Sequence, residues 1–126
     1  MRDFRKLDIW GKGILLVKEV YQISVKLPSD EKYGLKSQIC RAAVSIPSNI
    51  AEGASRNSEM EFKRFLEIAI GSSFELETQL ILILELKMME EVEINPIQEH
   101  IQILQKQINK LITAISANNQ KLKANS

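Results

Sequence analysis

Cysteine, glycine and proline are scarce in this sequence, and each scarcity excludes a class of protein. The single cysteine, Cys40, cannot form an internal disulfide, so the chain is not a disulfide scaffold and nothing points to an oxidising compartment. Five glycines and three prolines are too few for the turn-rich connections of an all-β fold. The remaining composition, 44% hydrophobic and 26% charged, is ordinary for a single globular domain of 126 residues.

Long hydrophobic runs are also missing. The longest apolar run without a charge is Leu80–Leu84, which is far too short to span a bilayer. The N-terminal stretch MRDFRKLDIW carries five charges, so it lacks the apolar block of a signal peptide. We therefore expect a cytoplasmic protein that does not associate with membranes.

Side chains that could support catalysis are few. With one histidine, His100, and one cysteine, a nucleophilic dyad or triad would have to be built from isolated residues. A di-metal carboxylate site in a helical bundle needs Glu-x-x-His pairs, and the residue three positions before His100 is Ile97. The sequence therefore predicts no enzyme, no catalytic residues, no metal and no cofactor. We expect His100 to be a solvated helix residue and Cys40 a small core or interface residue.

Charges of the two signs are unevenly distributed along the chain. Residues 1–58 contain ten Lys/Arg and six Asp/Glu, residues 59–100 contain three and ten, and residues 101–126 contain four and none. Such segregation could steer a polyanion towards one face of the molecule. It could equally bring basic and acidic surfaces together within the fold or between subunits, and the sequence favours this second interpretation.

Hydrophobic periodicity predicts four helices. Apolar residues recur three and four positions apart over about 7–26, 35–52, 59–91 and 96–117. Ser58 opens a capping box before the third helix, while Asn95 and Pro96 suit the cap and first turn of the fourth. Because the connections are short, we expect an all-α, up-down-up-down antiparallel four-helix bundle as a single domain over residues 1–118. The polar residues 119–126 are expected to form a frayed tail.

Two residues conflict with helical geometry. Pro47 lacks a backbone donor and would crowd the carbonyl of Ala43, so we expect the second helix to bend or break there. Gly71 lies inside the third helix, where glycine costs about 1 kcal/mol relative to alanine. We therefore expect Gly71 to mark a place where helices pack closely.

A polar stripe follows the apolar seam of the second and third helices. Its predicted members form a structural network of Arg41, Ser45, Asn49, Glu52, Arg64 and Glu75. If the turn at 53–57 folds the second helix back on the third, Arg41 comes opposite Glu75 and Glu52 opposite Arg64. The stripe is then either a solvated polar face or a set of ion pairs that fixes helix register or subunit docking.

The segments YGLKSQICRAAVSIPSNIAEGASR and EFKRFLEIAIGSSFELETQL closely resemble the four-helix bundle family found in 23S ribosomal RNA intervening sequences. The N-terminal LDIWGKGILLVKEVY fits the family as well, so the resemblance covers about residues 4–90. Cys40 stands where the family more often has arginine, and Ala54 where an aromatic residue is common. Without an arginine at position 40, this region has one positive charge fewer with which to bind phosphate.

The resemblance implies a ring of five identical bundles with no established enzymatic activity. Relatives include the accessory protein of diversity-generating retroelements, which works with a reverse transcriptase and nucleic acid through a basic surface. The first helix independently supports assembly, because it carries a second apolar ridge that a single bundle core does not need. Trp10, Val17 and Tyr21 on this ridge are the predicted oligomer interface.

The sequence supports three functional hypotheses. The first is a homo-oligomeric scaffold, a homopentamer by resemblance, that binds nucleic acid, most plausibly structured RNA, through phosphate contacts. The candidate contacts are Arg2, Arg5, Lys6, Lys12, Arg56, Lys63, Lys106 and Lys110. No aromatic residues are interleaved with them in a way that suggests base stacking. The second hypothesis is an adaptor that presents the Ser45–Gly53 surface to a partner protein. The third, an enzyme, would require an unexpected bound metal or a perturbed carboxylate in a cleft.

Overall fold

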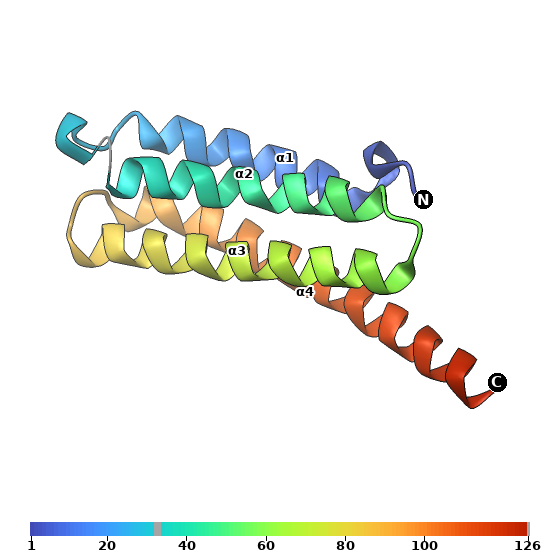
Figure 1. Cartoon of the computed structure of the whole chain (residues 1–126). Coiled ribbons are helices and arrows are strands. Elements are labelled where there is room, and N and C mark those ends of the chain that lie inside the picture. The colour runs from blue at the N-terminus through green and yellow to red at the C-terminus, as the bar shows by residue number, and fades with distance from the viewer. Residues whose placement is uncertain (32–33, 126) are drawn as a thin grey trace.

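The computed structural model describes residues 1–31 and 34–125, and over these residues the chain is all-helical, without a strand. The α-helices are α1 (Asp8–Ser24), α2 (Leu35–Ala54), α3 (Glu59–Glu85) and α4 (Glu91–Ala124). Two short 3-10 helices, η1 (Phe4–Lys6) and η2 (Ser29–Glu31), lie before α1 and between α1 and α2. Figure 1 shows that consecutive α-helices run in opposite directions, as the short connections predict. Among the described helices, none is both long and apolar enough to cross a membrane.

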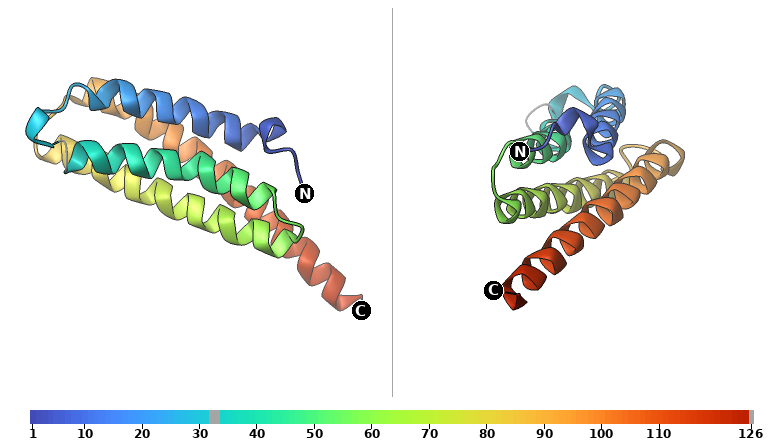
Figure 2. Two further views of the ribbon diagram at one scale, coloured as in Figure 1. Left: turned by 45° about the horizontal axis from the view of Figure 1, so that its top comes forward. Right: turned by 90° about the vertical axis from the view of Figure 1, so that its right-hand side faces the viewer.

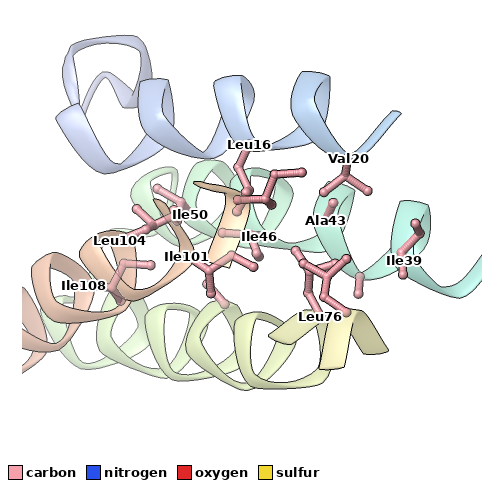
Figure 3. Packing of buried hydrophobic residues seen from close by; sticks show 14 of the residues in the cluster. Leu16, Val20, Ile39, Ala43, Ile46, Ile50, Leu76, Ile101, Leu104 and Ile108 are labelled. Atoms are coloured by element: carbon pink, nitrogen blue, oxygen red, sulfur yellow. The ribbon is translucent and has the colours of Figure 1, made fainter. Parts of the chain in front are cut away.

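The four helices are arranged in a closed square. Each α-helix packs against its two neighbours in the order α1, α2, α3, α4, and α4 closes the square against α1. Figure 3 shows side chains from all four helices meeting in the centre, including Leu16, Ile46, Leu76 and Ile101. These four side chains are almost completely buried. Each contributes roughly 1.5–3 kcal/mol by removal from water, so the apolar seams account for the fold.

The helix ends between α3 and α4 differ from the prediction. The third helix ends at Glu85 rather than near residue 91, because Lys87 adopts a left-handed conformation with a φ of 58°. The Met88 amide then donates to the Ile83 carbonyl at 3.0 Å, a bond that closes the helix end. The left-handed residue therefore supplies the stop that the hydrophobic pattern alone does not show.

The fourth helix begins at Glu91, four residues before the predicted cap at Asn95. Glu90 and Glu93 form a reciprocal capping box, and Glu91 and Glu93 lie in the first turn, where the helix dipole favours acidic residues. Pro96 consequently lies inside the helix instead of at its first position. The capping box outweighs the N-terminal preference of proline.

The predicted break in α2 at Pro47 is wrong. The helix continues from Leu35 to Ala54 with Pro47 inside it, and Figures 1 and 2 show no visible kink. Pro47 is buried against α1, where a Cβ added to Gly13 would lie 3.2 Å from the Pro47 Cβ. The absence of a side chain at Gly13 leaves room for the proline ring between the two helices.

The close helix packing expected around Gly71 is not found within the described chain. A Cβ built at Gly71 would meet nothing within 4 Å, and the residue is exposed. The glycine that does mark a close approach is Gly53, where an added Cβ would lie 2.6 Å from the Phe65 Cβ. Gly53 thus allows α2 and α3 to meet closely beside their connecting turn.

The C-terminal part of α4 extends beyond the other three helices (Figures 1 and 2). Ile115 is the last buried residue of α4, and we call residues 116–124 the α4 arm. The tail expected over 119–126 is instead helical through Ala124, and Ser126 lies outside the described residues. Lys121 and Lys123 in the last turn favour the helical state because they oppose the negative end of the helix dipole.

Candidate nucleic-acid interface

Arg2, the first candidate phosphate contact, is held against the surface of the bundle by an ion pair. Its guanidinium forms a bidentate ion pair with the Glu59 carboxylate, with N–O distances of 2.5 and 2.7 Å. The guanidinium carbon also lies 4.5 Å from the centroid of the Phe62 ring. The Arg2 amide also donates to the Ala54 carbonyl at 2.8 Å. Arg2 therefore fastens the N-terminus across the turn between α2 and α3, and its charge is largely neutralised.

Three further candidates are paired with nearby carboxylates. Arg5 contacts Asp3 at 3.3 Å, and Lys12 contacts Asp8 at 3.0 Å. Arg56 contacts Glu52 at 2.6 Å and lies over the Phe65 ring at 5.0 Å. Since each pair cancels a positive charge locally, half of the predicted contacts are poorly suited to bind phosphate.

The other four candidates form no ion pair with any described residue. They are Lys6, Lys63, Lys106 and Lys110. Lys121, which the sequence interpretation assigned to the tail, is likewise unpaired on the α4 arm. Arg64, assigned to the polar network, lies over the Phe65 ring at 5.6 Å and forms no ion pair within the described part of the chain. The absence of any carboxylate after Glu99 is the signal that could have identified Lys121.

The second half of α4 concentrates the unpaired positive charge. Lys106, Lys110 and Lys121 follow one another at helical spacing, and every charged residue after Glu99 is a lysine. The intervening positions are rich in Asn and Gln, whose amides both donate and accept hydrogen bonds. At a rise of about 1.5 Å per residue, this carboxylate-free stretch of helix is roughly 36 Å long. Its lysines are exposed, and the C-terminal part of the helix that carries them projects beyond the bundle (Figure 2).

The basic N-terminal and acidic middle segments of the chain do meet within the fold. Arg2 contacts Glu59, and Lys26 contacts Glu93 at 2.7 Å between the end of α1 and the start of α4. Part of the charge segregation is therefore used in contacts within the fold, as the sequence interpretation favoured.

Two of these carboxylates have perturbed acidities. Hydrogen bonding from Arg2 lowers the pKa of Glu59, although partial burial opposes the shift. Hydrogen bonding from Lys26, with a further bond from the Glu90 amide, lowers the pKa of Glu93. In both cases the ionised form is favoured in the folded protein.

The neutral members of the polar network are brought together between α2 and α3. The Ser45 and Ser72 hydroxyls lie 2.8 Å apart, and the Asn49 amide donates to the Ser45 carbonyl and hydroxyl at 2.8 and 2.9 Å. Two helical turns from the serine pair, the Gln79 side-chain amide donates a hydrogen bond to the Gln38 side-chain oxygen at 3.5 Å. Direct hydrogen bonds thus join the facing polar edges of these two helices.

The charged members do not form the predicted pairs within the chain. Glu52 forms its ion pair with Arg56, four residues further along the chain, instead of with Arg64 on α3. Glu75 accepts a hydrogen bond from Gln79 at 3.4 Å, and Arg41 is exposed without an ion pair among the described residues. Arg56 is close to Glu52 in the sequence, so this local ion pair forms in place of the predicted one. Arg41 is exposed and retains its hydration, so it does not need a carboxylate partner.

The predicted oligomer ridge is only partly exposed. Trp10 packs edge-to-face on Phe4 with ring centroids 5.2 Å apart, and Trp10 and Val17 both contact the core. Tyr21 is 49% exposed. Between α1 and α2 an apolar groove is lined by Trp10, Ile14, Val17, Val44, Pro47, Ser48 and Ala51. The ridge therefore continues across α1 onto α2 as an open apolar surface.

The Ser45–Gly53 segment presents little surface of its own. Ile46, Pro47, Ile50 and Gly53 are buried, which leaves Ser48 and Glu52 as its exposed members. Its polar residues Ser45 and Asn49 bond within the bundle. Most of the segment therefore serves the packing of α2 against α1 and α3.

The isolated reactive side chains lie apart. His100 is exposed on α4 and its Nδ1 lies 2.8 Å from the Glu19 carboxylate on α1, while Cys40 is half-buried on α2. Among the described residues, no group of three or more His, Cys, Asp or Glu side chains is placed to hold a metal ion.

Comparisons with known proteins extend this description. A family model for the 23S rRNA-intervening sequence protein matches residues 5–110. Among solved structures, the chain is similar to a protein with unknown function from the S23 ribosomal protein family of Bacteroides thetaiotaomicron, with a TM-score of 0.77 and 22% sequence identity. The match covers 82% of this chain and 97% of that protein, and at this identity it shows the shared fold. No curated protein matches the chain.

Proposed function

This chain belongs to the 23S rRNA-intervening sequence protein family, and from that membership we propose that it is a non-enzymatic cytoplasmic scaffold that binds structured RNA. One observation carries the proposal. The second half of α4 gathers Lys106, Lys110 and Lys121 on a stretch of helix that has no carboxylate after Glu99, and part of that stretch projects beyond the bundle (Figure 1). Lysines bind the phosphates of the RNA backbone and do not contact the base edges, so they favour recognition of the shape of the RNA over recognition of its base sequence.

We further propose that the scaffold is a ring-shaped homo-oligomer, a pentamer, assembled through the apolar surface of α1 and α2. An exposed apolar patch of this kind is typical of a protein interface. Assembly would present several copies of the α4 surface on one particle, and their combined binding to one RNA would exceed the affinity of each copy.

The test is the salt dependence of RNA binding. Fluorescence anisotropy with a labelled RNA hairpin should show affinity falling steeply between about 50 and 200 mM salt. Replacing Lys106 and Lys110 by glutamine should reduce the log–log slope by about 1.4–1.8, because each phosphate contact contributes roughly 0.7–0.9. Lys12→Gln is the matched control, since Lys12 is already paired with Asp8 and should barely change the slope.

Absence of binding, or binding that is insensitive to salt, would contradict RNA binding by these lysines. Light scattering of the purified protein with and without the hairpin tests the assembly separately. A monomer that does not change mass would contradict the ring.

An adaptor for a partner protein is the second candidate function. The apolar groove between α1 and α2 favours it, because this groove also includes Ser48 and Ala51 from the Ser45–Gly53 segment. Salt-insensitive capture of a single protein, abolished by a polar substitution at Val44, would support the adaptor. Capture that disappears at physiological salt would count against it.

A further inference from the structure

A second groove, between α3 and α4, combines an exposed aromatic ring with the basic surface. It has a volume of about 240 Å³ and is lined by Ile70, Phe74, Gln105, Lys106 and Asn109. Phe74 is 54% exposed, unusual for a large aromatic side chain that could have been buried. Phe74 and Lys106 are far apart in the sequence, so the absence of aromatic interleaving did not reveal this arrangement.

Gly71 lies one helical turn before Phe74 and leaves the backbone beside it uncovered. Side chains on a helix lean towards its N-terminus, so the Phe74 ring leans towards the preceding turn, where Ile70 lines the groove with it and Gly71 lies outside the lining. Apart from its chain neighbours and the backbone of its own helix, no atom lies within 4 Å of a Cβ built at Gly71. A glycine inside a helix reduces stability, and packing within the described chain gives no reason for it here. Close approach of a flat ligand to the backbone would be such a reason.

The polar groups of the groove can contact both a base and a phosphate. Lys106 is unpaired, and Lys110 lies one turn further along the same side of α4. Asn109 makes no side-chain hydrogen bond to any described residue, so its amide is free to donate and accept. Gln105 is partly engaged, because its amide donates to the Glu77 carboxylate at 2.9 Å. Glu77 is a negative charge close to the groove and should weaken binding of an anion.

We propose that this groove binds one unpaired nucleobase of an RNA loop or bulge, stacked on Phe74. Asn109 contacts the edge of the base, Lys106 contacts the adjoining phosphate, and Gly71 leaves room for the flat ring. The proposal rests on the RNA-binding function proposed above and specifies the structural element of RNA that is recognised. Stacking of unpaired bases on aromatic side chains is a common mode of RNA recognition, and it tolerates different bases.

The experiment compares two labelled RNAs by fluorescence anisotropy, a hairpin with an unpaired loop and a fully paired duplex. Phe74→Leu should weaken binding of the hairpin by about 5- to 150-fold, the range expected for loss of one stacked base. Its affinity for the duplex and the salt slope should not change, because no charge is removed. Phe74→Trp should keep hairpin binding, since it retains an aromatic face. Ile68→Ala, which alters another exposed apolar residue of α3, is the matched control and should leave both affinities unchanged.

Two further variants probe the groove without removing the ring. Gly71→Ala should raise the unfolding temperature or leave it unchanged, yet weaken hairpin binding, because the new methyl group occupies the approach to Phe74. Glu77→Gln should strengthen binding of both RNAs.

Equal binding of the hairpin by Phe74→Leu and the parent protein would overturn the stacking proposal while leaving RNA binding intact. If Phe74→Leu instead lowers the particle mass in light scattering, a second copy of the chain covers the groove and the proposal is wrong. Failure of the parent protein to bind either RNA would overturn the proposed function and this inference together.

Discussion

Gly53 shows how one missing methyl group sets the distance between two helices. The position that its Cβ would occupy is 2.6 Å from the Phe65 Cβ and 3.0 Å from the Phe62 ring. Backbone and ring atoms of α3 cannot yield there as a flexible side-chain end would. The close contact between the end of α2 and the start of α3 therefore depends on glycine at this position.

Gly53→Ala should consequently destabilise the protein by about 1–3 kcal/mol, the usual cost of overpacking a core. The measurement is the midpoint of thermal or urea unfolding followed by circular dichroism. Gly11→Ala is the control, because a Cβ there meets nothing within 4 Å and should stabilise α1 by up to about 1 kcal/mol. Equal effects of the two substitutions would contradict the packing argument.

Glu59 is the residue whose ionisation is most closely tied to the N-terminus. Its pKa is lowered from an ordinary value of 4.5, chiefly by the hydrogen bonds from Arg2. The stabilisation that follows is fully present above the pKa of the unfolded chain, and it is lost as the pH falls through the lower pKa of the folded protein. Because the pair is exposed to solvent, its contribution stays below about 1 kcal/mol.

Glu59→Gln should therefore lower the unfolding temperature at pH 6 to 7, and the difference from the parent protein should disappear well below pH 4.5. Thermal unfolding across this pH range measures the effect. Glu61→Gln, in the same first turn of α3 but without an ion pair among the described residues, should show no such convergence. A constant difference at all pH values would mean that Glu59 acts through packing alone.

At the scale of elements, α4 has two parts with different roles. Up to Ile115 it supplies buried residues to the core, whereas in the α4 arm Leu122 is 71% exposed. Because the arm adds no residue to the core of the bundle, its helical state depends on continuation from the preceding turns and on the lysines near its end.

A variant that ends at Ala117 should therefore unfold within about 0.5 kcal/mol of the parent protein, since no buried residue is removed. Its helical circular dichroism signal should fall in proportion to the residues lost. A variant that ends at Asn109 is the control and should be strongly destabilised, because it also loses the buried Ile115. Strong destabilisation of the variant that ends at Ala117 would show that the α4 arm is part of the core.

Across the whole molecule, the two ends of the bundle differ in charge. The N-terminus, the turn between α2 and α3 and the α4 arm lie at one end, while the turn between α3 and α4 lies at the other (Figure 1). That opposite turn carries Glu85, Glu90, Glu91 and Glu93. A polyanion would therefore approach the end with the α4 arm and be repelled from the acidic turn.

The proposed assembly also belongs to the scale of the whole molecule, and the groove between α1 and α2 makes it testable. The double substitution Tyr21→Ser and Val44→Ser should lower the particle mass measured by light scattering while helicity is kept, because both side chains are exposed and neither is part of the core. Val92→Ser, at a residue that is 75% exposed near the acidic turn, should leave the mass unchanged. An unchanged mass for the double variant would place any subunit contact elsewhere. Trp10 is unsuitable for this test because it packs on Phe4 and the core.

The sequence by itself determined the number of helices, their apolar seams and the start of α3 at the Ser58 cap. These features depend on neighbours three or four residues apart, so they can be recognised in one segment at a time. The same locality explains the recognition of the family, because the matching motifs lie within α1, α2 and α3.

The tertiary structure alone decided which charges are free and where Pro47 and Phe74 lie. Arg2 is neutralised by Glu59, Pro47 fits against Gly13, and Phe74 lies beside Lys106, and in each case the two residues belong to different elements. Ion pairs and packing depend on distances of a few ångströms between such segments, and helical spacing does not specify these distances. The position of each helix against its neighbours therefore determines which residues are available for binding.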